Sequence, residues 1–391
     1  MPRHCYKYLW RKCLEPEIIA EAWLNARKGK ARRSEVDYIE RNFEACVSRM
    51  REMIFNTRPD GDPDKAFYPV KHRPKHRFEF GKIRKTYCPT MWEQWVHHIV
   101  VLVLKPILLK TSYNYSCGSV PNKGSSYGKR EIERAIRKRG FKYYAKLDVR
   151  HFFHHVGIGF VIKELKLLID DEWLFFLIRR IFFYFPNSLP LGFYPSQWFC
   201  NYILCRVDWL IKKRRPICYV RYVDDFVICH NNKKWLHTLI RYIKQYIGRK
   251  LRLKLKENWQ VVRFDYHSIN RGIIGRPLDF MGFVFYRNRT IIRRSTYYRT
   301  CRFAKKLATY QTIALRQAQS MISRMGPFKT TDTIEAWRLY IQPYISITSL
   351  KSIIRKYQRR YINENRLERG VVYRRTEAVC QNERLRLPST A

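Results

Sequence analysis

The sequence lacks several features that would place it in well-known classes of protein. Its 11 cysteines include no C-x-x-C pair, so the ligand spacing of common zinc sites is missing. It has no uncharged apolar run of the ~18 to 20 residues that a membrane span needs, because the best candidate, Trp95 to Leu109, contains His97, His98 and Lys105. No secretory signal pattern follows Met1. These absences predict a cytoplasmic protein with reduced, mostly buried thiols, and they argue against a zinc site.

Acidic residues are scarce. The chain has 32 Asp and Glu against 78 Lys and Arg, a formal net charge of +46 and a pI of about 10.2. A surface of this charge binds polyanions in a salt-dependent way, and an aromatic content of 15% supplies rings on which bases can stack. Nucleic acid is therefore the expected partner. An anionic membrane surface is the weaker alternative, because no strongly amphipathic basic helix dominates the sequence.

The stretch from Ile217 to His230 predicts a tight β-hairpin with two acids at its tip. Asp224 and Asp225 lie between two runs of β-branched and aromatic residues. A solvated acidic turn would explain these two residues alone. However, a second strand-like run begins at Tyr143 and ends in Asp148, and three aspartates on two neighbouring strands can hold two divalent ions ~3.5–4 Å apart. Such ions activate a 3′-hydroxyl and stabilise a leaving pyrophosphate, so the acids indicate polymerase chemistry.

These residues resemble the motifs of reverse transcriptases. The segment Arg221 to Phe226 is similar to their Tyr-x-Asp-Asp box, and Leu147-Asp148 with Phe152-Phe153 is similar to their first aspartate motif. The separation of the two motifs also fits, because 76 residues (224 − 148 = 76) leave room for helices between them. The resemblance implies that Asp148, Asp224 and Asp225 are catalytic. It also implies two Mg²⁺ ions, with Mn²⁺ as a substitute, whose ligands are Asp148, Val149, Asp224 and Asp225.

The resemblance implies a set of residues that bind the incoming nucleotide. Lys82 and Arg84 precede Pro89 as in the fingers motif of bacterial retroelement enzymes, where a lysine and an arginine reach the triphosphate. A basic strand pair on the surface is the alternative. Phe153 matches the family's steric gate, a ring that leaves no room for a 2′-hydroxyl and so selects deoxynucleotides. The alternative is a core position for Phe153, which the adjacent Phe152 can fill instead.

One segment distinguishes branches of the family. Leu191, Gly192, Ser196 and Gln197 resemble the pattern of reverse transcriptases from diversity-generating retroelements and of related defence-associated enzymes, whereas most bacterial retroelement enzymes carry Gln-Gly-x-x-x-Ser-Pro here. The resemblance assigns Gly192 and Gln197 to the nucleotide site. It implies a bacterial or phage-encoded protein that either copies template adenines inaccurately or acts in anti-phage defence, and both roles stay open.

An alternating segment follows the second expected palm helix. Leu251, Leu253 and Leu255 alternate with basic residues, which predicts a half-buried strand. Either Lys254 or Lys256 is expected to protonate pyrophosphate, as a lysine does at the corresponding family motif. A solvated basic face is the alternative.

A further motif and the partners follow from the resemblance. Leu278 to Phe283 looks like the primer grip, with Phe280, Met281 and Gly282 in contact with the primer. The implied partners are a structured template RNA, a DNA or RNA primer and deoxynucleoside triphosphates. A small accessory protein or a second reverse transcriptase subunit is a further candidate, and no membrane is involved. The rival function is a catalytically retired polymerase fold that serves as an RNA-binding scaffold.

The expected fold is α+β, a right-hand polymerase with a ferredoxin-like palm sheet backed by helices and a helical thumb. Ser34 is expected to cap an N-terminal helix whose apolar face runs from Val36 to Ile54. The expected divisions are an N-terminal basic helical segment (1–66), fingers (67–140), a palm (141–290) with a helical fingers insertion at about 159–186, a helical thumb (291–362) and a charged tail (363–391).

Overall fold

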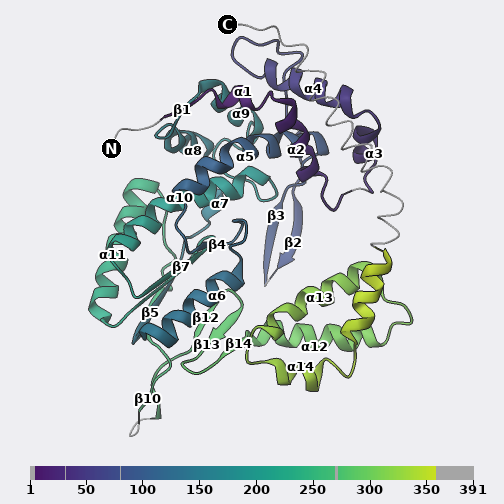
Figure 1. Ribbon diagram of the computed structural model, residues 1–391. Coiled ribbons are helices and arrows are strands. Elements are labelled where there is room, and N and C mark those ends of the chain that lie inside the picture. The colour runs from purple at the N-terminus through teal and green to yellow at the C-terminus, as the bar shows by residue number, and fades with distance from the viewer. Residues whose placement is uncertain (1–4, 31, 80, 269–271, 358–391) are drawn as a thin grey trace.

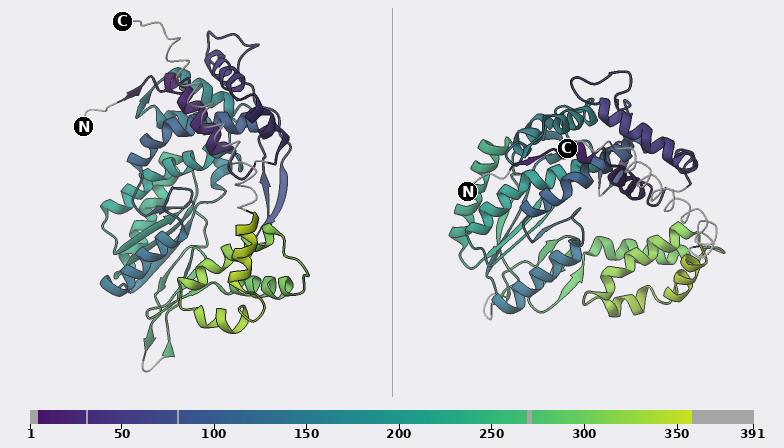
Figure 2. Two further views of the ribbon diagram at one scale, coloured as in Figure 1. Left: turned by 45° about the vertical axis from the view of Figure 1, so that its right-hand side comes forward. Right: turned by 45° about the horizontal axis from the view of Figure 1, so that its top comes forward.

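The computed structural model describes residues 5–30, 32–79, 81–268 and 272–357. Figure 1 and Figure 2 show three groups of elements: helices of the N-terminal half on one side, a β-sheet with its covering helices in the middle, and a group of C-terminal helices on the other side. The tail expected at 363–391 and the end of the expected thumb, 358–362, lie outside the described residues.

A five-stranded sheet forms the centre of the molecule. β5 lies antiparallel to both β8 and β9, and β7 and β8 form a hairpin. With the helical segments between them, β5, β7, β8 and β9 follow the β-α-β-β-α-β order of a ferredoxin-like sheet. The predicted α+β class, the strand ending in Asp148 and the acidic hairpin are therefore confirmed. In spatial order the strands are β4 (Ser116–Cys117), β7 (Cys218–Tyr222), β8 (Asp225–His230), β5 (Tyr143–Asp148) and β9 (Gln260–Arg263).

Residues of the central strands alternate between the two faces of this sheet, as strand geometry requires. On one face, Ala145 and Ile228 join the core that includes residues of α10 and α11. On the other face, Val227 joins a second core cluster with Ile132 of α6. Asp225 shares the register of Val227, so the acids at the strand ends belong to the α6 face. The three helices are α6 (Ser125–Arg134), α10 (Tyr194–Lys213) and α11 (Lys233–Leu251).

Helices of the N-terminal half surround the largest buried core. The apolar face expected from Val36 to Ile54 is buried, but Ser34 is the first helical residue and not the cap. The helix is also interrupted at Asn42, whose side-chain amide donates to the Tyr38 carbonyl at 3.0 Å and so competes with the backbone ladder. The helices are α1 (Leu9–Lys12), α2 (Pro16–Ala26), α3 (Ser34–Arg41), α4 (Phe43–Asn56), α5 (Met91–Thr111), α7 (Phe152–His155), α8 (Ile158–Leu165) and α9 (Glu172–Ile181).

Smaller sheets and the C-terminal helices complete the described part. The β2–β3 hairpin extends from the N-terminal half toward the C-terminal helices, and the sheet β12-β13-β14 leads into those helices (Figure 1). The remaining elements are β1 (Tyr6–Lys7), β2 (Lys75–Glu79), β3 (Lys82–Thr86), the π-helical turn η1 (Ala135–Arg139), β6 (Ile169–Asp170), β10 (His267–Ser268), β11 (Gly272–Ile273), β12 (Leu278–Phe280), β13 (Phe283–Phe285), β14 (Thr290–Ile292), α12 (Arg294–Ala308), α13 (Leu315–Lys329) and α14 (Ile334–Tyr340).

The strand expected from Leu251 to Leu255 is wrong in part. α11 continues through Leu251, and Arg252 then turns the chain with a left-handed backbone (φ 55°). Leu253 and Leu255 are buried, as the alternation predicts, but the segment pairs only through a single bridge between Leu255 and Val149. An extended segment along the edge of a sheet has the same period of two as a strand, so the sequence pattern alone does not distinguish them.

The described ranges contain no helix long and apolar enough to cross a membrane. Their cysteines are free thiols and most are buried, as the composition predicts.

Candidate active site

The three predicted aspartates lie together at one end of the central strands. Asp148 is the last residue of β5 and lies directly opposite Asp225, the first residue of β8. Asp224 precedes Asp225 in the turn that joins β7 to β8. Directly opposed residues of antiparallel strands share one face of the sheet, so two carboxylates and their neighbour meet at a single edge.

The turn that carries Asp224 is fixed by backbone contacts. Val223 has a left-handed backbone (φ 57°), which is unusual for a β-branched residue. Its N–H donates to the Cys117 carbonyl of β4 at 3.1 Å, and the N–H of Val149 donates to the Asp224 carbonyl at 3.2 Å. Val149 is buried in the core, so its side chain faces away from the acids and only its backbone lies at the site.

Burial and mutual repulsion perturb the two acids of the turn. Loss of solvent, followed by the charges of Asp148 and Asp225, raises the pKa of Asp224 from 3.8 to about 6. Burial likewise raises the pKa of Asp225, although Lys146 opposes the shift. A cation bound beside carboxyl groups with raised pKa values stabilises their charged form and so lowers those pKa values.

Lys256 pairs with the first aspartate. Its Nζ contacts Asp148 Oδ2, and its backbone N–H donates to the Asp148 carbonyl at 2.8 Å. The side chain of Lys254 is exposed, so of the two candidate lysines it is Lys256 that reaches the acids. The other carboxylate oxygen, Asp148 Oδ1, is buried and accepts no hydrogen bond.

The cluster has the chemistry of a site for a hard divalent cation. Carboxylate oxygens are the ligands that Mg²⁺ prefers, and Mg²⁺ is commonly held by one or two carboxylates together with water and substrate phosphates. The unpartnered Asp148 Oδ1 is such an oxygen. In the part of the chain that the structure describes, no group of three or more His, Cys, Asp or Glu side chains is arranged to hold a metal ion.

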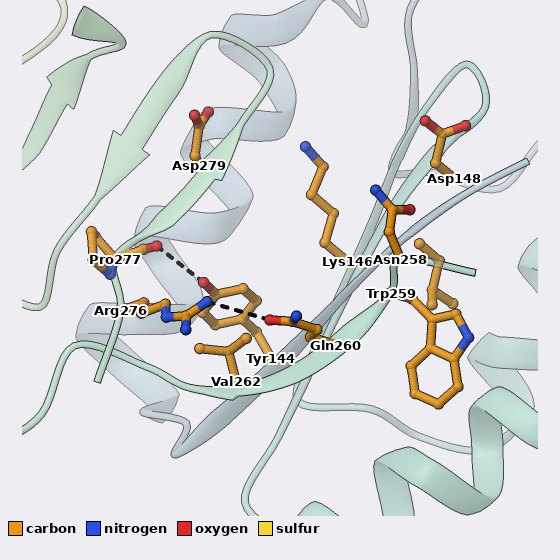
Figure 3. Close-up of a pocket in the computed structure, with 11 residues that line it drawn as sticks. Tyr144, Lys146, Asp148, Asn258, Trp259, Gln260, Val262, Arg276, Pro277 and Asp279 are labelled. Carbon is orange, nitrogen blue, oxygen red and sulfur yellow. Dashed lines mark hydrogen bonds between the residues drawn. The ribbon is translucent and has the colours of Figure 1, made fainter. Parts of the chain in front are cut away.

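A pocket of about 350 Å³ opens beside Asp148. Figure 3 shows Lys146 between Asp148 on β5 and Asp279 on β12, with Trp259 and Arg276 also lining the space. A hydrogen bond of 3.0 Å from the Tyr144 hydroxyl to the Pro277 carbonyl fixes the β12 side of the pocket. Asp148 is thus accessible from a hollow between the central sheet and the small C-terminal sheet.

The two candidate gate residues have different surroundings. Phe152 is a buried core residue, whereas Phe153 is partly exposed and packs at the edge of the core. The backbone N–H of Leu189 donates to the Phe153 carbonyl at 2.8 Å, which fixes the position of this residue. The structure therefore leaves the ring of Phe153, and not that of Phe152, accessible to a ligand.

Gly192 and Gln197 lie where α10 begins. Gly192 has φ +107°, and a Cβ atom there would lie 2.0 Å from the Tyr87 carbonyl oxygen. The N–H of Tyr87 donates to the Leu191 carbonyl at 2.8 Å, so this glycine permits close contact with the segment that follows β3. Gln197 is partly buried on α10, and its Nε2 atom is buried without a hydrogen-bond acceptor.

The remaining predicted site residues lie on two hairpins. Arg84 is exposed on β3 opposite Arg77, and Lys82 is the first residue of β3, its side chain outside the described part. Met281 and Gly282 form the two-residue turn between β12 and β13, both with positive φ (54° and 88°). Phe280 is buried in the core beneath this turn, so the exposed part of the expected primer grip is the turn itself.

Sequence reasoning missed the charged residues behind the catalytic turn. Arg221 and Asp208 are both fully buried and form an ion pair between β7 and α10. The available signal was an arginine inside an otherwise apolar strand and a lone carboxylate in an apolar stretch of helix, because such charges are rarely buried unless they are paired.

The comparison with protein families identifies the chain. The profile described as "Reverse transcriptase (RNA-dependent DNA polymerase)" matches residues 71–284, more than half of the 391 residues. The chain therefore belongs to the reverse transcriptase family. The predicted resemblance and the predicted enzyme class, RNA-directed DNA polymerase, are confirmed at the level of this family.

Individual relatives are distant. The retron Ec73 reverse transcriptase of Escherichia coli is 29% identical over 106 residues, which cover 24% of this chain and 34% of that protein, so the match spans about a third of the relative. Among solved structures, apo telomerase from Candida tropicalis has a TM-score of 0.45 and 12% identity, covering 70% of this chain and 59% of that chain. Telomerase from Candida albicans in complex with a TWJ fragment of telomeric RNA has a TM-score of 0.42 and 11% identity, with 77% and 61% covered.

Proposed function

We propose that this protein is an RNA-directed DNA polymerase that adds deoxynucleotides to a primer end on an RNA template. The observation that carries the proposal is the cluster of Asp148, Asp224 and Asp225 at the ends of adjacent antiparallel strands, with a pocket beside Asp148. Family membership supports the same reaction. The alternative, an inactive RNA-binding scaffold, gives no reason for keeping three mutually repelling acids in a partly buried position.

Asp148 and Asp224, with Asp225 and the backbone of Val149 beside them, are the proposed metal ligands. Bound Mg²⁺ or Mn²⁺ would activate the primer hydroxyl and neutralise the charge of the leaving pyrophosphate. Lys256 is held beside Asp148 and is the proposed proton donor to pyrophosphate. Its contact with Asp148 also keeps the proton-donating group next to the reacting phosphates.

The other site residues are proposed to select and hold the nucleotide. Arg84 and Lys82 on the β2–β3 hairpin would reach the triphosphate, because guanidinium and ammonium groups pair with phosphate oxygens. Phe153 is the proposed steric gate, since its ring is partly exposed while Phe152 lies in the core. Gly192 and Gln197 would border the base pair; the unpartnered Nε2 of Gln197 is a donor suited to that position.

The proposed division of the chain is that of a right-hand polymerase. The fingers are 67–140, with the insertion at about 159–186; the palm is 141–290, and the thumb is 291–362. The β12–β13 turn at Met281 and Gly282 is the proposed primer grip. A bidentate pair of Arg293 with Asp279, with distances of 3.0 Å from Nε to Oδ2 and 2.5 Å from Nη2 to Oδ1, supports this turn at the point where the proposed thumb begins.

The biological role is proposed to be that of a bacterial retroelement enzyme, working with a structured template RNA. The partial match to a retron reverse transcriptase supports this class. Within it, error-prone copying and anti-phage defence are distinguished by sequencing cDNA made on a defined RNA. Misincorporation concentrated at template adenines and relieved by Leu191→Gln supports the diversity-generating role, whereas uniformly accurate copying supports defence.

A primer-extension assay tests the proposed reaction. The purified protein should extend a DNA primer annealed to RNA with deoxynucleotides and Mg²⁺, and Asp224→Asn should abolish extension because one charged ligand is lost. The same variant should bind the RNA with nearly unchanged affinity. RNA binding without extension by the wild-type protein would instead support the scaffold function.

A further inference from the structure

A buried charged network lies directly behind the turn that carries Asp224. Arg221 on β7 and Asp208 on α10 are both fully buried, and they form a bidentate pair with distances of 2.8 Å from Nε to Oδ1 and 2.7 Å from Nη2 to Oδ2. The Tyr219 hydroxyl donates to Asp208 Oδ1 at 2.6 Å. The register of β7 puts Tyr219 and Arg221 on the α10 face of the sheet, opposite to the face of the catalytic acids.

The Arg221 guanidinium uses each of its three nitrogen atoms in this network. Besides the pair with Asp208, Nη2 donates to the Ser116 hydroxyl at 2.6 Å, and Nη1 donates to Asn201 Oδ1 at 3.0 Å. Two more contacts are to backbone carbonyls: Nη2 donates to that of Asn201 at 3.3 Å, and Nη1 donates to that of Val223, in the acidic turn, at 2.8 Å. Arginine alone has a rigid fork that can bond in these directions at once.

That carbonyl belongs to the strained residue of the turn. A left-handed conformation is unfavourable for a β-branched residue such as Val223 and persists only where surrounding contacts enforce it. β4 supplies a second contact, since the Cys117 carbonyl accepts from the Val223 N–H at 3.1 Å. Gly118 leaves the turn room, because a Cβ there would lie 2.8 Å from Val223 Cγ2.

These contacts fix both peptide planes around Asp224. The plane before it is held through the Val223 carbonyl by Arg221, and the plane after it through the Asp224 carbonyl by the Val149 N–H. Because the two planes determine the backbone dihedrals of Asp224, they set the direction in which its carboxylate leaves the chain. The Arg221 contact is therefore connected to the reacting atoms although its side chain lies on the other face.

Stability alone does not account for such a pair. A buried ion pair can often be replaced by well-packed apolar residues without loss of stability. We propose that Arg221 is a positioning residue of the active site: anchored by Asp208, it holds Val223 in its left-handed conformation and thereby aims the Asp224 carboxylate at the metal ions. This inference rests on the proposed polymerase function.

The test compares variants with and without the Val223 contact. Arg221→Lys keeps a positive charge near Asp208 but lacks the fork, and the double variant Arg221→Met with Asp208→Leu replaces the pair with apolar groups of similar length. Both should lower kcat for primer extension by up to ~10²-fold, the loss expected for a misplacement of about 1 Å, and raise the Mg²⁺ concentration needed for half-maximal rate. Independently of activity, both should weaken Mn²⁺ binding measured by electron paramagnetic resonance and speed amide hydrogen exchange in residues 218–230.

Two further variants separate positioning from general stability. Tyr219→Phe removes a hydrogen bond to the same carboxylate without touching the turn, so it should lower the melting temperature and leave kcat and Mn²⁺ affinity unchanged. Val223→Gly, added to Arg221→Lys, should restore part of the lost rate and metal affinity, because glycine adopts positive φ without the strain that Arg221 offsets.

The positioning role would be overturned if a folded Arg221→Lys protein had unchanged kcat and Mn²⁺ affinity. If Arg221→Lys does not fold, the same result in the double variant would overturn it. An equal loss of rate and metal affinity in Tyr219→Phe, at an equal loss of stability, would overturn it as well. The wild-type protein in the same assay tests the polymerase function itself. If the wild-type protein extends the primer and the Arg221 variants do so equally well, the positioning role is wrong but the polymerase function stands.

Discussion

Asp224 combines a partly buried position with two neighbouring carboxylates, and its pKa is raised from 3.8 to about 6. A raised pKa means that the folded state holds this proton more tightly than the unfolded state does. Without metal ions, the contribution of Asp224 to stability therefore falls as pH rises from about 4 to 6 and stays low above that. Ionised Asp224 therefore lowers the stability of the fold, a cost that its proposed role as a metal ligand would explain.

We predict that Asp224→Asn melts at a higher temperature than the wild-type protein at pH 7.5 without divalent ions, and that the difference shrinks at pH 5. Thermal unfolding followed by circular dichroism at both pH values measures this. Asp64→Asn, a change at an exposed turn, is the matched control and should have no effect. Parallel pH profiles for the wild-type protein and Asp224→Asn would show that Asp224 is not destabilised by its surroundings.

Phe153→Val should raise incorporation of ribonucleotides far more than it lowers use of deoxynucleotides, because it clears the space beneath the sugar. Competition between the two nucleotide types in primer extension gives the selectivity. Phe152→Val is the control: it leaves a cavity in the core and should lower stability without changing sugar choice. If only Phe152→Val changes the selectivity between ribonucleotides and deoxynucleotides, Phe152 and not Phe153 is the steric gate.

At the scale of single residues, the sequence predicts a functional role best where a residue type is unusual for its position, such as an acid at the end of an apolar strand. The paired acids after an apolar strand were recognisable, and so was the strand that ends in Asp148. The role of Lys256 could not be separated from that of Lys254, because both alternate in the same pattern and only the position of the chain beside Asp148 distinguishes them. The Arg221 network depends on side chains from three elements, and no local pattern connects Ser116, Asp208 and Arg221.

At the scale of elements, the contact between the segment after β3 and the start of α10 joins two parts of the proposed nucleotide site. Gly192→Ala would place a Cβ 2.0 Å from the Tyr87 carbonyl oxygen and strain a backbone with φ +107°. We predict a loss of about 1–3 kcal/mol in the free energy of unfolding and a higher KM for deoxynucleotides, because β3 carries Arg84. Chemical denaturation and steady-state kinetics measure the two effects.

Gly248→Ala is the control for that prediction. Nothing lies within 4 Å of a Cβ at Gly248, and alanine favours the helical backbone of α11, so stability should rise slightly. If Gly192→Ala lowers stability but leaves the KM for deoxynucleotides unchanged, the contact between Gly192 and Tyr87 does not contribute to nucleotide binding.

Most elements could be predicted from periodicity, and the exceptions have local causes. The interruption at Asn42 arises from a side chain that bonds to the backbone, which leaves the apolar spacing on both sides intact. α6 begins at Ser125 and continues into the π-helical turn η1. A π-helical turn adds a residue without changing the type of residue, so hydrophobic spacing gives little sign of it.

At the scale of the whole molecule, a net charge of +46 predicts that the proposed binding of RNA depends strongly on salt. Binding that neutralises about six phosphates should weaken by ~10³-fold between about 50 and 200 mM salt. Filter binding or fluorescence anisotropy over this range gives the slope. Asp224→Asn should show the same slope, because the change is remote from the phosphate contacts, and an affinity that is flat with salt would contradict the prediction.

The α+β fold could be predicted because the two acidic motifs resemble those of reverse transcriptases, and the central sheet has the ferredoxin-like order that the resemblance implies. The C-terminal helices were expected only from their position and charge in the sequence, which do not predict how they pack. Their core includes Ala304, Leu307, Met321, Phe328 and Trp337, and a short amphipathic helix does not reveal which neighbour it packs against.

The order of the strands also determines when the site can form during synthesis of the chain. β5 is complete at Asp148, but its partner β8 begins 77 residues later (225 − 148 = 77) and its other partner, β9, begins at Gln260. At a ribosomal rate of ~5 to 20 residues per second, β5 waits roughly 4 to 15 s with both edges unpaired, a state prone to aggregation. The three aspartates therefore meet only after β8 has emerged, so the proposed catalytic site is absent from the nascent protein during most of its translation.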